Sequence, residues 1–146
     1  MKFKLIIDRS KEETVTVTAH EPSELTKQIE KLVLEYSGSD KLIAYTEDEI
    51  TMLPVMQIEC ITVLDGKTWA IDHRGQRYRL KQRLYELETQ LPASFIRINK
   101  STLANEARIE KFTASFSGAV DAVFKCGYRE YVSRRCFAQI KRRYDL

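Results

Sequence analysis

The sequence contains no long hydrophobic run. None of its apolar stretches approaches the roughly 20 consecutive residues that a membrane-spanning helix requires. The apolar run near the N-terminus is short and is followed at once by the charged residues 8–13, which argues against a signal peptide. We therefore expect a cytoplasmic protein. With 43% hydrophobic and 31% charged residues, the 146-residue chain has a globular composition and can bury one sizeable core.

Residues that often mark catalytic or metal sites are also scarce. The three cysteines, Cys60, Cys126 and Cys136, form no CxxC pair, and neither His20 nor His73 lies near a cysteine at metal-ligand spacing. The five glycines are scattered at turns, so neither type of glycine-rich phosphate-binding loop is present. We expect reduced thiols, no metal, no cofactor and no enzymatic activity. Only a site assembled from residues far apart in the sequence would contradict this expectation.

The charge is distributed unevenly along the chain, although the net charge is only +3. Residues 1–50 carry 7 Lys/Arg and 11 Asp/Glu, whereas residues 93–146 carry 11 Lys/Arg and 5 Asp/Glu. A basic C-terminal third on a chain of low net charge indicates an anionic partner for that end. An ordinary solvated basic face is the alternative that charge alone leaves open.

Residues 1–39 have the pattern of a small ββα unit. Apolar and polar residues alternate over residues 3–7 and 14–18, which predicts two strands joined by a charged turn. The apolar residues between positions 22 and 36 then recur at helical spacing, and the Ser-Gly-Ser sequence at 37–39 ends the helix. This unit could mediate dimerisation or partner docking through its helix, or the helix could simply pack on its own hairpin.

The rest of the chain is rich in short strand-like runs. Asp65-Gly66 is a tight-turn signal, and the leucines from Leu80 to Leu91 predict one short helix that Pro92 ends. Ser133 can cap a final helix that directs Phe137, Ile140 and Tyr144 inward. The predicted strands are residues 41–45, 49–53, 56–64, 67–72, 76–80, 95–98, 109–116, 120–124 and 128–132.

Several motifs occur in an order that resembles the LytTR family of DNA-binding domains. The most specific is Phe-Ile-Arg-Ile-Asn-Lys-Ser-Thr-Leu-Ala-Asn at residues 95–105. The others are Met-Gln-Ile-Glu-Cys at 56–60, Arg-Leu-Tyr-Glu-Leu-Glu-Thr-Gln-Leu at 83–91, turns at 116–118 and 125–127, and Val-Ser-Arg-Arg at 132–135. The resemblance covers roughly residues 41–146. It departs from the family pattern at Asn99, where histidine is common, and at Cys136, where an aromatic residue is common.

This resemblance implies a mainly β fold, with ten strands in small packed sheets and a short helix, for residues 40–146. It also implies a transcriptional regulator that inserts strand-end loops into successive major grooves of double-stranded DNA and bends it. Family members often bind repeat half-sites in pairs, so we expect a homodimer, at least on DNA. The roughly forty residues before the domain are too few for a receiver domain. The chain is thus similar to stand-alone regulators, some of which are held inactive by a membrane-bound inhibitor protein.

The resemblance also points to the residues that contact DNA. Arg135 is expected to read a base, because arginine can bond guanine through two hydrogen bonds. Arg97 alternates with Ile96 and Ile98, so it could instead line a solvated face of the sheet or brace the loop through Glu59. Ser101 and Asn105 are expected to satisfy backbone groups of the turn, and residues 141–143 are either a further contact or ordinary helix surface. The full set of expected contacts is Asn99, Lys100, Arg134, Arg135, Arg97 and Lys67.

Two other functions fit parts of the sequence. A protein-interaction module could use the basic end to bind an acidic protein or a membrane surface. Single-stranded RNA binding would need aromatic residues exposed side by side, and the C-terminal aromatics are explained more simply by core packing.

Overall fold

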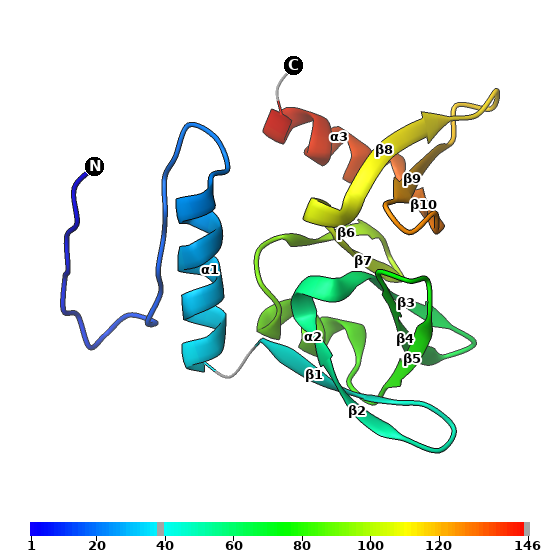
Figure 1. The fold of residues 1–146 in the computed structure, drawn as a ribbon. Coiled ribbons are helices and arrows are strands. Elements are labelled where there is room, and N and C mark those ends of the chain that lie inside the picture. The colour runs from blue at the N-terminus through cyan, green and yellow to red at the C-terminus, as the bar shows by residue number, and fades with distance from the viewer. Residues whose placement is uncertain (38–39, 145–146) are drawn as a thin grey trace.

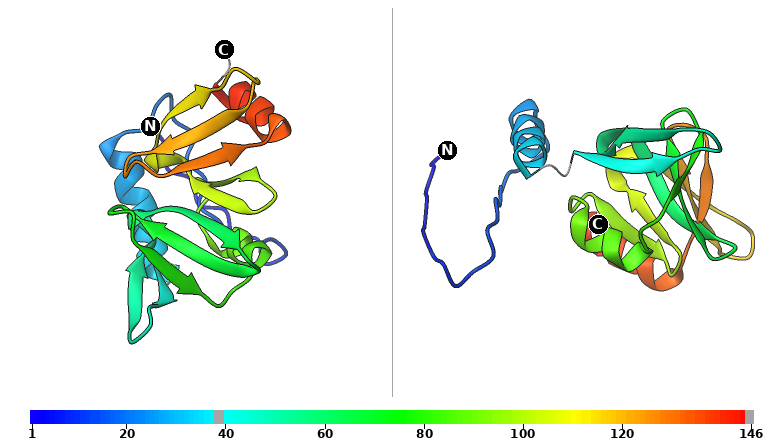
Figure 2. Two further views of the ribbon diagram at one scale, coloured as in Figure 1. Left: turned by 90° about the vertical axis from the view of Figure 1, so that its right-hand side faces the viewer. Right: turned by 90° about the horizontal axis from the view of Figure 1, so that it is seen from below.

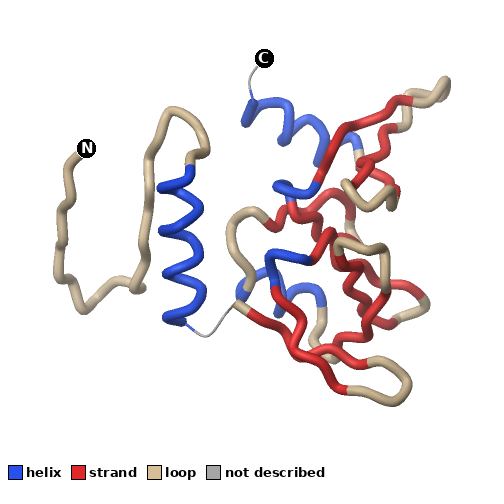
Figure 3. The backbone as a smooth tube through the Cα atoms, viewed as in Figure 1, coloured by secondary structure: helices blue, strands red, loops and turns tan. Residues whose placement is uncertain are grey.

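The computed structural model describes residues 1–37 and 40–144 of the chain, as three α-helices and ten strands (Figures 1 and 3). The mainly β architecture implied by the resemblance is confirmed. The helices are α1 (Glu24–Ser37), α2 (Leu84–Gln90) and α3 (Arg134–Tyr144). The strands are β1 (Lys41–Tyr45), β2 (Ile50–Pro54), β3 (Ile58–Leu64), β4 (Lys67–Asp72), β5 (Arg77–Leu80), β6 (Phe95–Asn99), β7 (Thr102–Asn105), β8 (Ile109–Ala114), β9 (Val120–Phe124) and β10 (Arg129–Val132).

The strands form two antiparallel sheets. Seven strands make the larger sheet in the order β2-β1-β5-β4-β3-β7-β6, and three make the smaller one in the order β10-β9-β8. Viewed from the side, the smaller sheet and α3 lie together beyond the β6 edge of the larger sheet (Figure 2). Among the described residues, no helix is both long and apolar enough to cross a membrane.

Strands β3 and β7 lie between two hydrophobic cores and supply side chains to both. Because successive strand residues point to opposite faces, Ile61 and Leu103 enter one core while Cys60 and Ala104 enter the other. The first core lies between the larger sheet and α2, whose Leu84 and Leu87 are buried. The second core joins β6, β9, β10 and α3 through Ile98, Phe124, Val132 and Ile140.

A buried ionic contact links the two sheets. Glu59 on β3 is fully buried, and its carboxylate accepts hydrogen bonds from the Arg108 guanidinium and from the Cys126 backbone N–H, the latter at 2.7 Å. Arg108 comes just before β8, and Cys126 lies in the turn between β9 and β10. Both carboxylate oxygens are thereby satisfied, as a buried charge requires. This contact fixes the smaller sheet against the larger one.

The predicted hairpin at the N-terminus is wrong. Residues 1–23 contain no strand, and only a turn is present, in which Lys11 N–H donates to Asp8 O. A two-residue loop there would pair Leu5 with Thr14, and so would set Leu5 and Val15 on opposite faces of the hairpin. The two apolar sets therefore cannot share one face in that register.

The predicted N-terminal helix is confirmed with a later start. α1 begins at Glu24 rather than Pro22, because Ser23 and Thr26 cap one another through reciprocal bonds from Thr26 N–H to Ser23 Oγ and from Ser23 N–H to Thr26 Oγ1. The predicted stop at residues 37–39 falls partly outside the described residues, which resume at Asp40.

Three further details differ from the predictions. Leu80 belongs to the predicted strand at 76–80, observed as β5, where it pairs with Thr68, and the short helix starts at Leu84 rather than at Leu80. Strand β7 was not predicted, although all four of its residues are buried. Tyr144 is 56% exposed rather than directed inward, and its hydroxyl donates to Glu106.

Candidate nucleic-acid interface

A surface groove of about 890 Å³ runs between the β6–β7 turn and the start of α3. It brings together residues from β3, α2, β6 and its turn, β10 and the start of α3. Four of the six predicted contact residues are close to one another here. The lining includes Arg97, Asn99, Lys100 and Ser101 from β6 and its turn, Glu130 and Tyr131 from β10, Ser133 and Arg135 from the helix start, Leu64 from β3 and Glu88 from α2.

The turn after β6 is held by side-chain and backbone hydrogen bonds. The Asn99 amide donates from Nδ2 to the Tyr131 carbonyl at 2.7 Å and accepts at Oδ1 from the Ser101 N–H at 2.8 Å. The Ser101 carbonyl accepts from Val63 N–H at 2.9 Å. The Lys100 side chain is exposed and has no hydrogen bond or ion pair to any residue that the structure describes. A fixed turn therefore presents one free ammonium group.

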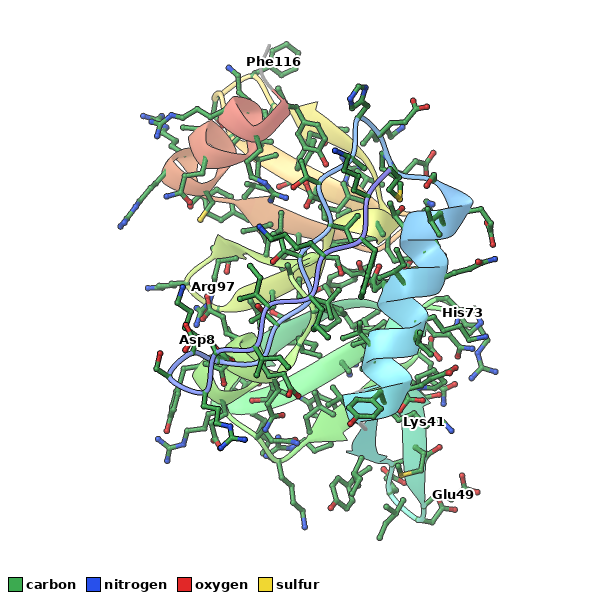
Figure 4. The ribbon with its side chains drawn as sticks, turned by 90° about the vertical axis from the view of Figure 1, so that its left-hand side faces the viewer. Asp8, Lys41, Glu49, His73, Arg97 and Phe116 are labelled. Atoms are coloured by element: carbon green, nitrogen blue, oxygen red, sulfur yellow. The ribbon has the colours of Figure 1, made fainter. Side chains whose placement is uncertain are left out.

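Arg97 is engaged within the protein. Its guanidinium bonds the Glu88 carboxylate of α2, with Nη2 at 3.1 Å from Oε2, and Nη1 donates to the Lys100 carbonyl at 2.7 Å. The expected bracing role is present, but the acidic partner is Glu88 rather than Glu59, since Glu59 is bonded to Arg108. β6 is an edge strand, and Figure 4 shows Arg97 at the outer side of the molecule.

The start of α3 is fixed against the same strand. Ser133 N–H donates to the Ile98 carbonyl at 2.8 Å, and Ser133 Oγ accepts from Cys136 N–H at 3.2 Å, which confirms the predicted cap. Arg134 and Arg135 follow directly, and both are exposed. Because successive helical residues point about 100° apart, Arg135 lines the groove, whereas Arg134 lines a neighbouring hollow of about 700 Å³.

The other basic residues of α3 differ in whether their side chains are ion-paired within the protein. Lys141 lines the same hollow as Arg134, with its ammonium group 5.6 Å from the centre of the Phe137 ring. Arg143 is bonded to Glu106 at 2.7 Å. The run at 141–143 thus contains a candidate contact, Lys141, and a residue that holds the helix end to the 3-10 turn before β8.

Lys67 lies outside the groove. It is exposed and pairs across the β3–β4 hairpin with Leu64, which does line the groove. The turn between them has positive φ at Asp65 and Gly66, 52° and 74°, as the tight-turn signal predicts. The hairpin therefore places Lys67 just beyond one edge of the groove, beside the acidic Asp65.

Two acidic residues in the groove were not anticipated from the sequence. Glu88 is bonded to Arg97, and the Glu130 carboxylate accepts from the Tyr128 hydroxyl at 2.9 Å and from Tyr131 N–H at 3.2 Å. Burial and this bond to Glu130 raise the pKa of Tyr128 far above its usual value, so the phenol remains a donor. Both carboxylates thus have donors within the protein. The partner of Glu88 lies nine residues away on β6, whereas those of Glu130 are its near neighbours Tyr128 and Tyr131.

Asn105 was expected to satisfy backbone groups, and it does. Its Nδ2 donates to the Ile58 carbonyl at 3.0 Å, and its Oδ1 accepts from Ala107 N–H at 3.2 Å. Its side chain is fully buried. The end of β7 is therefore tied to β3 and to the turn before β8. In the part of the chain that the structure describes, no cluster of His, Cys, Asp or Glu could hold a metal ion.

The sequence model of the LytTr DNA-binding domain matches residues 48–145, which include the groove and its basic residues. The chain belongs to the LytTr family. It is 33% identical over 147 residues to an uncharacterised HTH-type transcriptional regulator of Staphylococcus aureus strain bovine RF122 / ET3-1, a match that covers 100% of this chain and 99% of the relative. An uncharacterised HTH-type transcriptional regulator of strain NCTC 8325 / PS 47 matches with the same identity and coverage.

The LytTr fold is also found in a solved structure. A LytTr DNA-binding domain from a Bacillus cereus protein, described as a methyl-accepting/DNA response regulator, superposes with a TM-score of 0.66 at 21% identity. The match covers 73% of this chain and 98% of that domain. The described helices of this LytTr chain are separated by strands, since β1–β5 intervene between α1 and α2 and β6–β10 between α2 and α3. Nowhere in residues 1–37 or 40–144 do two consecutive helices form a helix-turn-helix.

Proposed function

We propose that this LytTr chain is a cytoplasmic transcriptional regulator that binds double-stranded DNA sequence-specifically, with no enzymatic activity. The observation that carries the proposal is the arrangement of its free cations. Lys100 projects from a turn held by hydrogen bonds, and Arg135 projects into the same groove from the start of a capped helix. Arg134 and Lys67 extend the basic surface on either side. Guanidinium groups at fixed positions can read guanine edges, while lysines bind phosphates as point charges.

In this proposal, the strand-end turn and the helix start enter neighbouring parts of the major groove, and the DNA bends to meet both. Asn99 and Arg97 act mainly by holding the turn, because their polar groups are bonded to Tyr131, Ser101, Glu88 and Lys100. Two copies bind paired half-sites. Residues 40–146 bind DNA, residues 1–39 form a separate functional unit, and a membrane-bound protein is a candidate inhibitor.

Selection of binding sites from random duplexes tests the proposal. We expect enrichment of two spaced half-sites, with binding of the selected duplex at about 0.15 M salt at least roughly a thousandfold tighter than binding of a scrambled duplex. Equal affinity for all duplexes would contradict it, and would favour an acidic protein or membrane surface as the partner of the basic end.

Replacing Lys100 by alanine is expected to weaken DNA binding without changing stability. The Lys100 side chain is exposed and has no described partner, and its carbonyl keeps the bond from Arg97 in the variant, so the fold loses nothing, but one phosphate contact is removed. Titrations at several salt concentrations give the slope of log affinity against log salt concentration. The steepness of this slope should decrease by about one unit in the variant. An unchanged slope would remove Lys100 from the interface.

Replacing Asn99 by alanine is expected to give a different pattern. The variant loses the bonds to Tyr131 and Ser101, and the free energy of unfolding should fall by about 1–3 kcal/mol in urea denaturation. DNA affinity should fall as well, because the turn that carries Lys100 is loosened. If affinity falls while stability is unchanged, Asn99 contacts DNA directly.

A further inference from the structure

The first eight residues expose an apolar surface that has no cover in the single chain. Phe3, Leu5 and Ile7 are 91%, 73% and 82% exposed, although their alternation is that of a strand with one buried face. These residues stand apart from the two sheets in Figure 1 and in the right-hand view of Figure 2, and Figure 4 labels Asp8 at the turn that follows them. The full-length match to the S. aureus regulators includes this segment, which lies outside the family match at 48–145.

The backbone of the segment is also without partners. Within residues 1–22, the backbone–backbone hydrogen bonds between described residues are limited to the turn bond from Lys11 to Asp8, and in the same turn Ser10 N–H donates to the Asp8 side chain. An extended segment with free N–H and C=O groups along both edges can accept another strand. The intrachain hairpin does not fill this role, because the register set by its turn separates Leu5 from Val15.

Helix α1 also has a stripe of exposed, largely apolar side chains. Its Leu34 is buried toward the DNA-binding domain, in the wall of a hollow that includes Pro54 and Met56. On the opposite side, Leu25 and Leu32 are 43% and 67% exposed, and Tyr36 follows one turn later at 88%. A sheet formed by the N-terminal segment could therefore be covered by this side of the helix.

We propose that residues 3–7 pair antiparallel with the same residues of a second copy, around a two-fold axis at Leu5. In this register Leu5 faces Leu5, and Phe3 of each copy faces Ile7 of the other, so these six side chains lie on one face, while Ile6 of each copy lies on the other face. On either side, Lys2 of one copy faces Asp8 of the other, which pairs opposite charges. The α1 helices of both copies cover the apolar face, and the ββα pattern of the sequence is completed between two chains.

Charge favours this end of the molecule for self-association. Residues 1–39 carry six Lys/Arg and seven Asp/Glu, so two copies meet there without strong repulsion. The C-terminal third carries 11 Lys/Arg against 5 Asp/Glu and would repel its copy. A parallel arrangement of the segment would set Lys2 against Lys2. The inference extends the homodimer of the proposed function and identifies the interface, but it does not require DNA binding to be correct.

Sedimentation of the full-length chain without DNA tests the interface. Leu5→Lys places two ammonium groups opposite one another and should raise the dimer dissociation constant roughly tenfold or more. Ile50→Lys is the matched control, since Ile50 is 72% exposed on the edge strand β2, and it should leave the dimer intact. A monomeric parent chain, an unchanged Leu5→Lys dimer, or loss of the dimer only in Ile50→Lys would overturn the proposal.

Cross-linking tests the register. Opposite residues of an antiparallel pair are about 4.5–5.5 Å apart at Cα, within reach of a disulfide. Leu5→Cys should therefore form a covalent dimer on mild oxidation, whereas Phe3→Cys should not, because the two copies of residue 3 would be about 13 Å apart. Equal or faster cross-linking of Phe3→Cys would overturn the register. Binding of Leu5→Lys to a single half-site should equal that of the parent, so failure of the interface and failure of DNA recognition give different results.

Discussion

Replacing Glu59 by alanine is expected to lower the free energy of unfolding by about 3–5 kcal/mol. The Glu59 carboxylate is fully buried and bonded to Arg108 and to the Cys126 N–H. Its removal leaves a partly buried guanidinium without its counter-charge and a partly buried N–H without an acceptor. Because these groups come from β3, from the chain before β8 and from the β9–β10 turn, the loss weakens the packing of the two sheets, which the second hydrophobic core still joins. Urea denaturation followed by circular dichroism measures the change.

The matched control is Glu88→Ala, which also removes a carboxylate bonded to an arginine. The Glu88 side chain is 44% exposed, and its pair with Arg97 is a surface pair. We expect a loss of at most about 1 kcal/mol from this variant. Similar losses from both variants would show that burial of Glu59 is not what makes its contact strong.

Replacing Arg135 by alanine is expected to weaken binding to the preferred DNA site by about 1–3 kcal/mol and to relax the preference at one base position. Arg135 is exposed at the start of α3, lines the groove and has no described ion pair, so its guanidinium is free to bond a base edge. Affinity for the selected duplex and for duplexes with single base changes provides the measurement. Arg135→Lys should recover charge but not the base preference.

Arg142→Ala is the control for charge alone. Arg142 lies two turns further along the same helix and is also exposed, so the net charge changes equally. This variant should weaken binding to all duplexes slightly and leave the base preference unchanged. If Arg135→Ala lowers affinity equally for all sequences, Arg135 contacts phosphate rather than a base.

Most of the DNA-binding fold could be predicted from local patterns, and the exceptions have physical causes. Strand β7 was not predicted because its sequence, Thr-Leu-Ala-Asn, is short and does not alternate between apolar and polar residues. Its four residues are buried because β3 and β6 flank it and two cores lie on its faces, which is a property of the assembled sheet. Leu80 has helical spacing to Leu84 and Leu87, but pairing with Thr68 in the sheet outweighs that local preference.

The candidate site was found in outline from the sequence. Motif order brought Asn99, Lys100 and Arg135 into consideration, and the structure places all three on one groove. The sequence could not show which of these residues hold the turn through bonds within the protein and which have side chains free to bind DNA. Asn99 is bonded to the carbonyl of Tyr131, 32 positions away in the chain, and no local sequence pattern predicts that bond.

The turn that carries Lys100 is held in place by other residues: the Asn99 amide, the Arg97 guanidinium and the backbone of Val63. Position 100 can therefore accept a different side chain without altering the framework around it. In the proposed interface, single substitutions at this position would change the strength of phosphate binding while the chain stays folded. Such a division between a constant frame and a variable tip separates the adjustment of DNA affinity from the maintenance of the fold.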